Sequence, residues 1–234
     1  MKAAPLHIGI VACSAEGAAL CYRTLCAEGA QRMGPHAHPE ISLHTHSLAD
    51  YVVCLDNNDL PGVGALMLSS AGKLARAGAD FLICPDNTIH QALGHVLPDS
   101  PLPWLHIAEE VAAEARARGY RRIGILGTRW LVDSSVYPDR LGALGLDYLR
   151  PAEADRITLG RIIMDELVYG EFKPESVARL QGIAERLRDA GCDAVVLGCT
   201  ELPLVLNDGN CALPTLDSTR ILARAALSRA LAPR

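Results

Sequence analysis

The sequence lacks any apolar stretch that approaches the roughly 20 residues of a membrane-spanning helix. Its early apolar run, residues 8–13, is soon followed by Glu16. It also lacks a basic stripe, because 22 basic and 27 acidic residues are mixed along the chain and the formal net charge is -5. Nucleic acids and anionic lipids require clustered positive charge. We therefore expect a cytoplasmic protein that binds neither nucleic acid nor membrane and that acts on a small molecule.

Cofactor and metal motifs are equally scarce. None of the eight cysteines forms a CxxC pair, so we expect most of them to be reduced and buried. No phosphate-binding glycine motif follows the first apolar run. Four histidines, at positions 36, 38, 44 and 46, form the densest cluster, but they lack acidic or cysteine ligands at a recognisable spacing, and a surface stretch is the simpler interpretation. We expect no metal and no cofactor.

What the sequence does contain is a series of short apolar runs, each followed by small polar residues and then an amphipathic stretch. This alternation predicts an α/β fold with parallel sheets. The expected strands are residues 6–12, 41–46, 81–84, 104–107, 122–127 and 194–198. The most periodic helix is expected to start near Pro174 and to stop at Gly191.

An internal repeat indicates two similar lobes. HIGIVAC (7–13) is echoed by RIGILGT (122–128), and GADFLICPDNT (78–88) by GCDAVVLGCTE (191–201), at shifts of about 115 and 113 residues. We expect a first lobe of residues 1–103 plus 216–234 and a second lobe of residues 104–215. Open α/β sheets bind ligands at the carboxyl ends of their strands, so the crevice between the lobes is the expected site.

Asp86 and Cys199 occupy matching positions in the repeat, each at the end of a strand. The polar residues that follow are expected to open helices, whose free N–H groups and hydroxyls hold a carboxylate. A helix N-terminus also favours a thiolate, the form that removes a proton. These following residues, the expected substrate-binding groups, are Asn87, Thr88, Thr200 and Glu201.

VLGCTE (196–201) together with PDNTIH (85–90) resembles the aspartate/glutamate racemase family, and the resemblance covers nearly the whole chain. It implies two pseudo-symmetric α/β lobes, a homodimer, and catalysis without pyridoxal phosphate. The chain has only three lysines, at positions 2, 73 and 173, and none lies in a recognisable Schiff-base setting. By this resemblance the chain is a cofactor-independent amino-acid racemase, with one acid or base per lobe acting on opposite faces of the α-carbon.

The chain departs from the family pattern at Asp86, where a cysteine is usual. Cys84 is the alternative first-lobe group, but both the repeat and the motif favour Asp86. A carboxylate held at a helix N-terminus is a poorer base than a thiolate, so the two directions of the reaction are expected to be unequal. The remaining candidates for substrate binding follow the first strand of each lobe: Cys13, Ser14, Thr128 and Arg129.

Two other functions remain open at this point. A single working cysteine would suit a decarboxylase or a cis-trans isomerase of a small carboxylic or dicarboxylic acid on the same fold. Two lobes around a cleft also describe a non-catalytic protein that binds a small ligand. The sequence leaves the side chain of the substrate undecided, because Tyr51 and Val168 stand where a cationic residue for a second carboxylate would be expected.

Overall fold

The computed structural model describes residues 4–233, and the chain divides into two compact units. Unit 1 consists of Met1–Ile107 and Thr219–Arg234, and unit 2 of Ala108–Ser218. Each unit is a parallel sheet flanked by helices. The predicted α/β class with two parallel sheets is therefore confirmed.

Unit 1 has a three-stranded sheet in the order β2-β1-β3, with every pair parallel. All five residues of the central strand, IGIVA, are buried, as expected for a β-branched run covered on both faces. The elements of unit 1 are β1 (Ile8–Ala12), α1 (Ala15–Met33), β2 (Ile41–Thr45), α2 (Leu48–Asp56), α3 (Leu60–Arg76), β3 (Phe81–Ile83), the 3-10 helix η1 (Thr88–Ala92), α4 (Leu93–Val96) and the 3-10 helix η2 (Leu97–Asp99). The last helix of the chain, α10 (Ser218–Ala230), returns to this unit.

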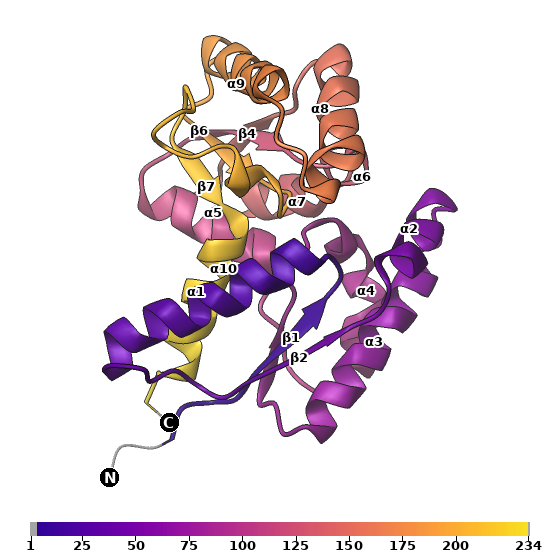
Figure 1. Cartoon of the computed structure of the whole chain (residues 1–234), viewed down its shortest axis with the longest axis vertical. Coiled ribbons are helices and arrows are strands. Elements are labelled where there is room, and N and C mark those ends of the chain that lie inside the picture. The colour runs from indigo at the N-terminus through magenta and orange to yellow at the C-terminus, as the bar shows by residue number, and fades with distance from the viewer. Residues whose placement is uncertain (1–3, 234) are drawn as a thin grey trace. The chain divides into compact units, whose positions relative to one another are not determined.

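Helices cover both faces of the unit 1 sheet. Side chains of α1 and α10 form one core with the sheet, including Leu25, Ile10 and Leu227. α3 packs against β1 and β2 (Figure 1). It buries the side chains of Val63 and Met67. The start of α1 is fixed by Ser14, whose hydroxyl accepts a hydrogen bond from the Gly17 N–H.

Unit 2 has a four-stranded parallel sheet in the order β5-β4-β6-β7. α9 begins at Pro174, which is well suited to the first turn of a helix because it has no N–H to lose. The elements of unit 2 are α5 (Ile107–Ala117), which starts at the last residue before the unit, β4 (Arg122–Leu126), α6 (Arg129–Val132), α7 (Val136–Ala143), β5 (Asp147–Leu149), α8 (Glu153–Asp165), η3 (Leu167–Tyr169), α9 (Pro174–Asp189), β6 (Ala194–Leu197), η4 (Leu202–Leu204) and β7 (Thr215–Asp217).

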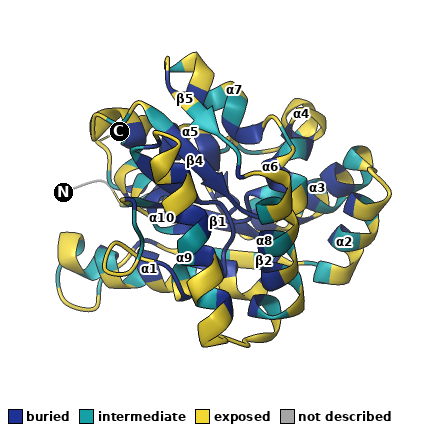
Figure 2. Cartoon of the chain, turned by 90° about the horizontal axis from the view of Figure 1, so that it is seen from above, coloured by how far each residue is buried: buried dark blue, intermediate teal, exposed yellow. Residues whose placement is uncertain are grey.

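α8 and α9 cover one face of the unit 2 sheet. Leu159 and Ile163 of α8 and Leu180 and Leu187 of α9 share a core with Leu126 of β4 and Val195 of β6. In Figure 2 the strands β1 and β4 are dark blue, and the exposed residues line the outer faces of the helices. The sequence-based prediction of α9 is confirmed within two residues.

The strand at residues 104–107 was predicted wrongly. Trp104 forms a single parallel bridge with Leu82, and Ile107 already begins α5. Only three residues lie between Pro103 and α5, which leaves room for one bridge but not for a strand. The sequence also gave no sign of the two three-residue strands, β5 and β7.

Among the described residues, no helix has both the length and the apolar character needed to cross a membrane. All eight cysteines are free, and five of them are buried, in agreement with their interpretation as reduced, mostly apolar residues: Cys13, Cys21, Cys84, Cys192 and Cys199.

Candidate active site

The site residues of unit 1 follow two neighbouring strands. Cys13 and Ser14 come after β1, and Asp86 comes shortly after β3, so all three lie at the carboxyl edge of the sheet. The Asp86 carboxylate accepts hydrogen bonds from the backbone N–H groups of Cys13 (3.1 Å) and Ser14 (3.2 Å). These groups open helix α1, and its N-terminus stabilises a negative charge. The structure thus brings together three of the predicted residues and gives the Asp86 carboxylate two N–H donors.

Cys84, the alternative first-lobe group, is fully buried. Its thiol donates to the backbone carbonyl of Asp86, with a sulfur to oxygen distance of 3.6 Å. Burial, followed by the negative charge of Asp86, raises the pKa of the Cys84 thiol well above its ordinary value. A thiol in this environment stays protonated, which favours Asp86 over Cys84 as the acid–base group.

His90 fixes the backbone of Asp86. Its Nδ1–H donates to the Asp86 carbonyl (3.0 Å), while its Nε2 accepts the N–H of Ile107 (3.3 Å), the first residue of α5. Because Nε2 accepts a bond, the ring is neutral with its proton on Nδ1. His90 therefore positions Asp86 and supports the start of the next helix at the same time.

The helix expected after Asp86 is shorter and less regular than predicted. Asn87 is buried and precedes the 3-10 helix η1, which begins at Thr88 and passes into the four-residue α4. After Cys199 the chain forms only the three-residue η4. The turn at residues 207–210 leaves no room for a longer helix there. The expected helix N-termini at Thr88 and Thr200 are therefore wrong, because no regular helix with an appreciable dipole starts at either position.

In unit 2 the Cys199 thiol contacts a carboxylate where a helix N-terminus was expected. The Cys199 thiol donates to Oε2 of Glu201 at 2.8 Å, and the Thr200 hydroxyl donates to the same oxygen at 2.8 Å. All three residues are buried, with Glu201 only 4% exposed. A thiol within hydrogen-bond reach of a carboxylate has a built-in acceptor for its proton. Sequence reasoning assigned Glu201 to substrate binding and missed this contact with the thiol.

Gly198 explains how the thiol reaches this position. A side chain at Gly198 would place a Cβ 2.7 Å from Cδ2 of Leu131 and 2.8 Å from the backbone oxygen of Leu126. The Gly198 N–H also donates to that oxygen at 2.7 Å, which extends the pairing of β4 with β6 by one residue. The glycine lets the two strand ends approach closely just before Cys199.

Thr128 and Arg129 follow β4, the neighbour of β6. The Thr128 hydroxyl accepts the N–H of Leu131 and caps α6, and the residue is buried. Arg129 is exposed, and its guanidinium lies over the Trp130 ring at 4.7 Å from the ring centre. The structure therefore places Thr128 at the same sheet edge as Cys199 and Arg129 on the first turn of a short helix.

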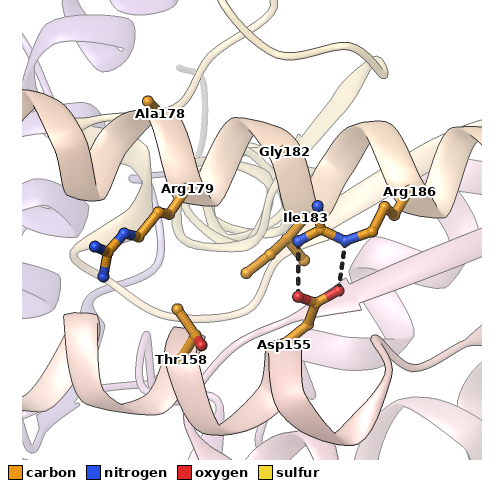
Figure 3. Close-up of a pocket in the computed structure, with 7 residues that line it drawn as sticks. All are labelled: Asp155, Thr158, Ala178, Arg179, Gly182, Ile183 and Arg186. Atoms are coloured by element: carbon orange, nitrogen blue, oxygen red, sulfur yellow. Dashed lines mark hydrogen bonds and ion pairs between the residues drawn. The ribbon is translucent and has the colours of Figure 1, made fainter.

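A surface pocket of unit 2 lies elsewhere, between α8 and α9 (Figure 3). The Arg186 guanidinium donates twice to the Asp155 carboxylate there, at 2.7 Å each, which neutralises its charge. None of the predicted site residues lines this pocket. The lining residues are Asp155, Thr158, Ala178, Arg179, Gly182, Ile183 and Arg186.

The histidines weighed as metal ligands have other partners. His44 and His46 lie with their ring centres 4.9 Å apart, and each contacts a serine of α3. Within residues 4–233 no group of three or more histidine, cysteine, aspartate or glutamate side chains is arranged to hold a metal ion.

Comparisons with known proteins agree with this arrangement. The model of the Asp/Glu/Hydantoin racemase family matches residues 10–226. The broad specificity amino-acid racemase RacX of Bacillus subtilis is 25% identical over 169 residues, which are 71% of this chain and 71% of that protein. A glutamate racemase of Thermus thermophilus is 31% identical over 160 residues, 66% of this chain but only 56% of the longer enzyme.

A solved structure is similar along the whole chain. The crystal structure of a candidate Asp/Glu racemase from Yersinia pestis has a TM-score of 0.88 and 28% sequence identity, and the match covers 99% of this chain and 100% of that one. The family model covers nearly the full length, and the carboxyl-edge residues of both units carry the motifs on which the resemblance was based. The chain belongs to the Asp/Glu/hydantoin racemase family.

Proposed function

We propose that the chain is a cofactor-independent amino-acid racemase that moves the α-proton of its substrate with Cys199 and Asp86. Membership of the racemase family and the racemase relatives support this class of isomerase. The observation that carries the proposal is the hydrogen bond of the Cys199 thiol to the buried Glu201 carboxylate. This contact supplies the acceptor that a thiol needs before it can act as a base.

On the unit 2 side the proton moves in two steps. Glu201 takes the proton from Sγ of Cys199, and the resulting thiolate removes the α-proton of the substrate. The Thr200 hydroxyl donates to the same Glu201 oxygen and so holds the carboxylate in place. In the reverse direction Cys199 returns a proton to the α-carbon and recovers one from Glu201.

On the unit 1 side Asp86 is proposed to give or take the proton on the opposite face of the α-carbon. Its two N–H donors stabilise the charged carboxylate, so protonated Asp86 is a strong acid but deprotonated Asp86 is a weak base. The equilibrium constant of racemisation is one, so kcat/KM is equal for the two enantiomers. The difference between Asp86 as an acid and Asp86 as a base is therefore expected in the kcat values of the two enantiomers.

The firm holding of Asp86 by Cys13 and Ser14 also favours a second candidate. If Asp86 serves only to order that turn, Cys199 acts alone, and the chain is a decarboxylase or a cis-trans isomerase of a small carboxylic or dicarboxylic acid. Release of carbon dioxide or movement of a double bond, without α-proton exchange of any amino acid, would distinguish this reaction from racemisation.

The substrate is proposed to be a small amino acid held by backbone and hydroxyl groups at the two carboxyl edges. The candidates are the residues predicted from sequence: Cys13, Ser14, Asn87, Thr88, Thr128, Thr200 and, for a second carboxylate, Arg129. Assembly as a homodimer and location in the cytoplasm stay predictions from the sequence.

The test is incubation with a panel of L- and D-amino acids in D2O, followed by NMR of the α-proton signals. The wild-type protein is expected to exchange the α-proton of at least one amino acid, and Cys199→Ala is expected to abolish that exchange. Cys211→Ala, which removes a partly buried thiol of the same unit, is the matched control and should exchange normally. Full exchange by Cys199→Ala would refute the role of the thiol.

A further inference from the structure

The peptide unit between Leu197 and Gly198, which comes just before Cys199, is hydrogen-bonded at both ends. Its N–H belongs to Gly198 and donates to the backbone oxygen of Leu126 on β4 at 2.7 Å. Its carbonyl belongs to Leu197 and accepts from the hydroxyl of Ser218 at 2.8 Å. A peptide unit is planar, so bonds at its two opposite edges fix the orientation of the whole plane. The chain therefore enters the Cys199 turn in one direction.

A side chain supplies the bond to the carbonyl. The three-residue strand β7 ends at Asp217, which pairs with Leu197 of β6. Ser218 follows and begins α10, and its hydroxyl donates to the Leu197 carbonyl. Ser218 is fully buried, and it is the last residue of unit 2, so all these contacts lie within that unit. One of the two bonds that hold the peptide plane can thus be removed by a single substitution.

Tyr137 of α7 contacts both Ser218 and Gly198. Its hydroxyl is hydrogen-bonded to the Ser218 side chain, and its ring carbon Cε2 lies 3.5 Å from the position that a Cβ on Gly198 would take. The Ser218 proton is used for the Leu197 carbonyl, so the Tyr137 hydroxyl donates to Ser218. Burial raises the pKa of Tyr137, which keeps the donated proton in place. These contacts restrict the rotation of the Ser218 hydroxyl.

We propose that Ser218 is a positioning residue that holds the Cys199 thiol in place for proton transfer. This role rests on the proposed racemase function, because it concerns the thiol that removes the α-proton. Gly198 permits many backbone conformations, so the turn into Cys199 needs a restraint from outside. Without the Ser218 bond the peptide plane can rotate, and the 2.8 Å contact of the thiol with Glu201 is then lost. Ser218 acts on the substrate only through Cys199.

The test separates kcat from KM. A misplaced thiol slows the transfer of the α-proton, whereas the other groups proposed to hold the substrate are unchanged. Ser218→Ala is expected to lower kcat for α-proton exchange about tenfold with KM unchanged, since a misplacement of about 1 Å can cost roughly 100-fold. Ser218→Thr keeps the hydroxyl and is expected to recover most of kcat.

Ser176→Ala is the matched control. Ser176 is a buried serine of the same unit, and its hydroxyl donates to the Glu166 carboxylate at 2.6 Å and not to β6. Its replacement should lower the melting temperature as Ser218→Ala does but leave kcat unchanged. NMR in D2O measures the exchange, and circular dichroism measures the amount of folded protein to which each kcat refers.

Wild-type kcat in Ser218→Ala would overturn the positioning role and leave the racemase function standing. The same conclusion follows from an equal fall of kcat in Ser176→Ala, or from a fall that folded Ser218→Thr does not recover. If Ser218→Ala does not fold, Ser218→Cys decides, because a thiol of similar shape is only a weak donor and should lower kcat with KM unchanged. Absence of α-proton exchange in the wild-type protein would instead contradict the racemase function itself.

Discussion

Cys199 and Asp86, the two side chains that we propose as acid–base groups, have different partners. The Cys199 thiol meets a buried carboxylate, which attracts its proton, whereas the Asp86 carboxylate meets two N–H donors, which stabilise its charge. The matching positions of the repeat therefore hold a thiol beside a carboxylate and a carboxylate beside two N–H donors. The repeat revealed these positions in the sequence, but the partners of each side chain could not be inferred from spacing alone.

Replacing Glu201 tests whether its carboxylate takes the proton of the thiol. Glutamine keeps the size and one accepting oxygen but does not accept a proton. We expect Glu201→Gln to retain the fold and to slow α-proton exchange about 100-fold, the lower range for the loss of a general base. NMR in D2O measures the exchange and thermal unfolding measures the fold, and exchange at the wild-type rate would mean that Glu201 only positions the thiol.

Replacing Tyr51 tests its unsatisfied hydroxyl through stability. Tyr51→Phe removes a buried donor that meets no partner in hydrogen-bond geometry within residues 4–233, so we expect an unchanged or higher melting temperature. Tyr137→Phe is the matched control, because Tyr137 is equally buried but its hydroxyl contacts Ser218, and its loss should lower the melting temperature. Clear destabilisation by Tyr51→Phe would mean that the hydroxyl has a structural bond.

His44 should also make stability depend on pH. Its folded pKa is lowered below the ordinary value of 6.5 by burial, by Lys73 and by His46, so the unfolded chain binds the proton more readily. The contribution of neutral His44 is therefore present above about pH 6.5 and is lost as the pH falls through the lower folded pKa. Urea unfolding at several pH values should show a shallower loss in acid for His44→Gln, and identical slopes would contradict the shift.

At the scale of elements, the longer and more apolar segments were predictable and the short ones were not. β1, β4 and α9 have clear periodicity and clear boundaries. β5 and β7 have three residues each and lie at or near a sheet edge, so local pattern carries too little signal. The helix expected after Cys199 failed because polar residues typical of a helix start are followed there, a few residues later, by a turn.

The close approach of β4 and β6 gives a prediction for Gly198. Gly198→Ala places a Cβ against backbone and against Leu131, so we expect a loss of about 1–3 kcal/mol in unfolding free energy and a larger loss of exchange activity. Gly142→Ala in α7 is the control, because nothing lies within 4 Å of its Cβ and alanine favours a helix. Equal stability of the two variants in urea unfolding would show that the strand ends have room to move.

For the whole molecule, the repeat seen in the sequence is also present in the topology of the two units. β1 and β4 are the first strands of their units, and each pairs with the next two strands on either side, in the orders β2-β1-β3 and β5-β4-β6. The contacts of His44 with Ser70 and Lys73 were not found from sequence, because they join β2 to α3 and form only after the unit has folded. The spacing of His44 and His46 was visible, but it suggested a metal site.

Because the two proposed groups act on opposite faces, losing one should separate exchange from racemisation. In Asp86→Asn, Cys199 still removes and returns the proton on its own face, so we expect partial α-proton exchange with retention of configuration and little racemisation. NMR in D2O measures the exchange and optical rotation measures the racemisation. Racemisation at the wild-type rate by this variant would exclude Asp86 as the unit 1 group.

The central claim is that Cys199 and Asp86 act on one substrate from opposite sides. A crystal structure of the protein with a bound amino acid that it racemises tests this claim most directly. The account predicts Sγ of Cys199 on one face of the α-carbon and the Asp86 carboxylate on the other, each within about 4 Å of the carbon, as proton transfer requires. An amino acid that contacts only one of the two groups, or Cys199 buried away from it, would contradict the account.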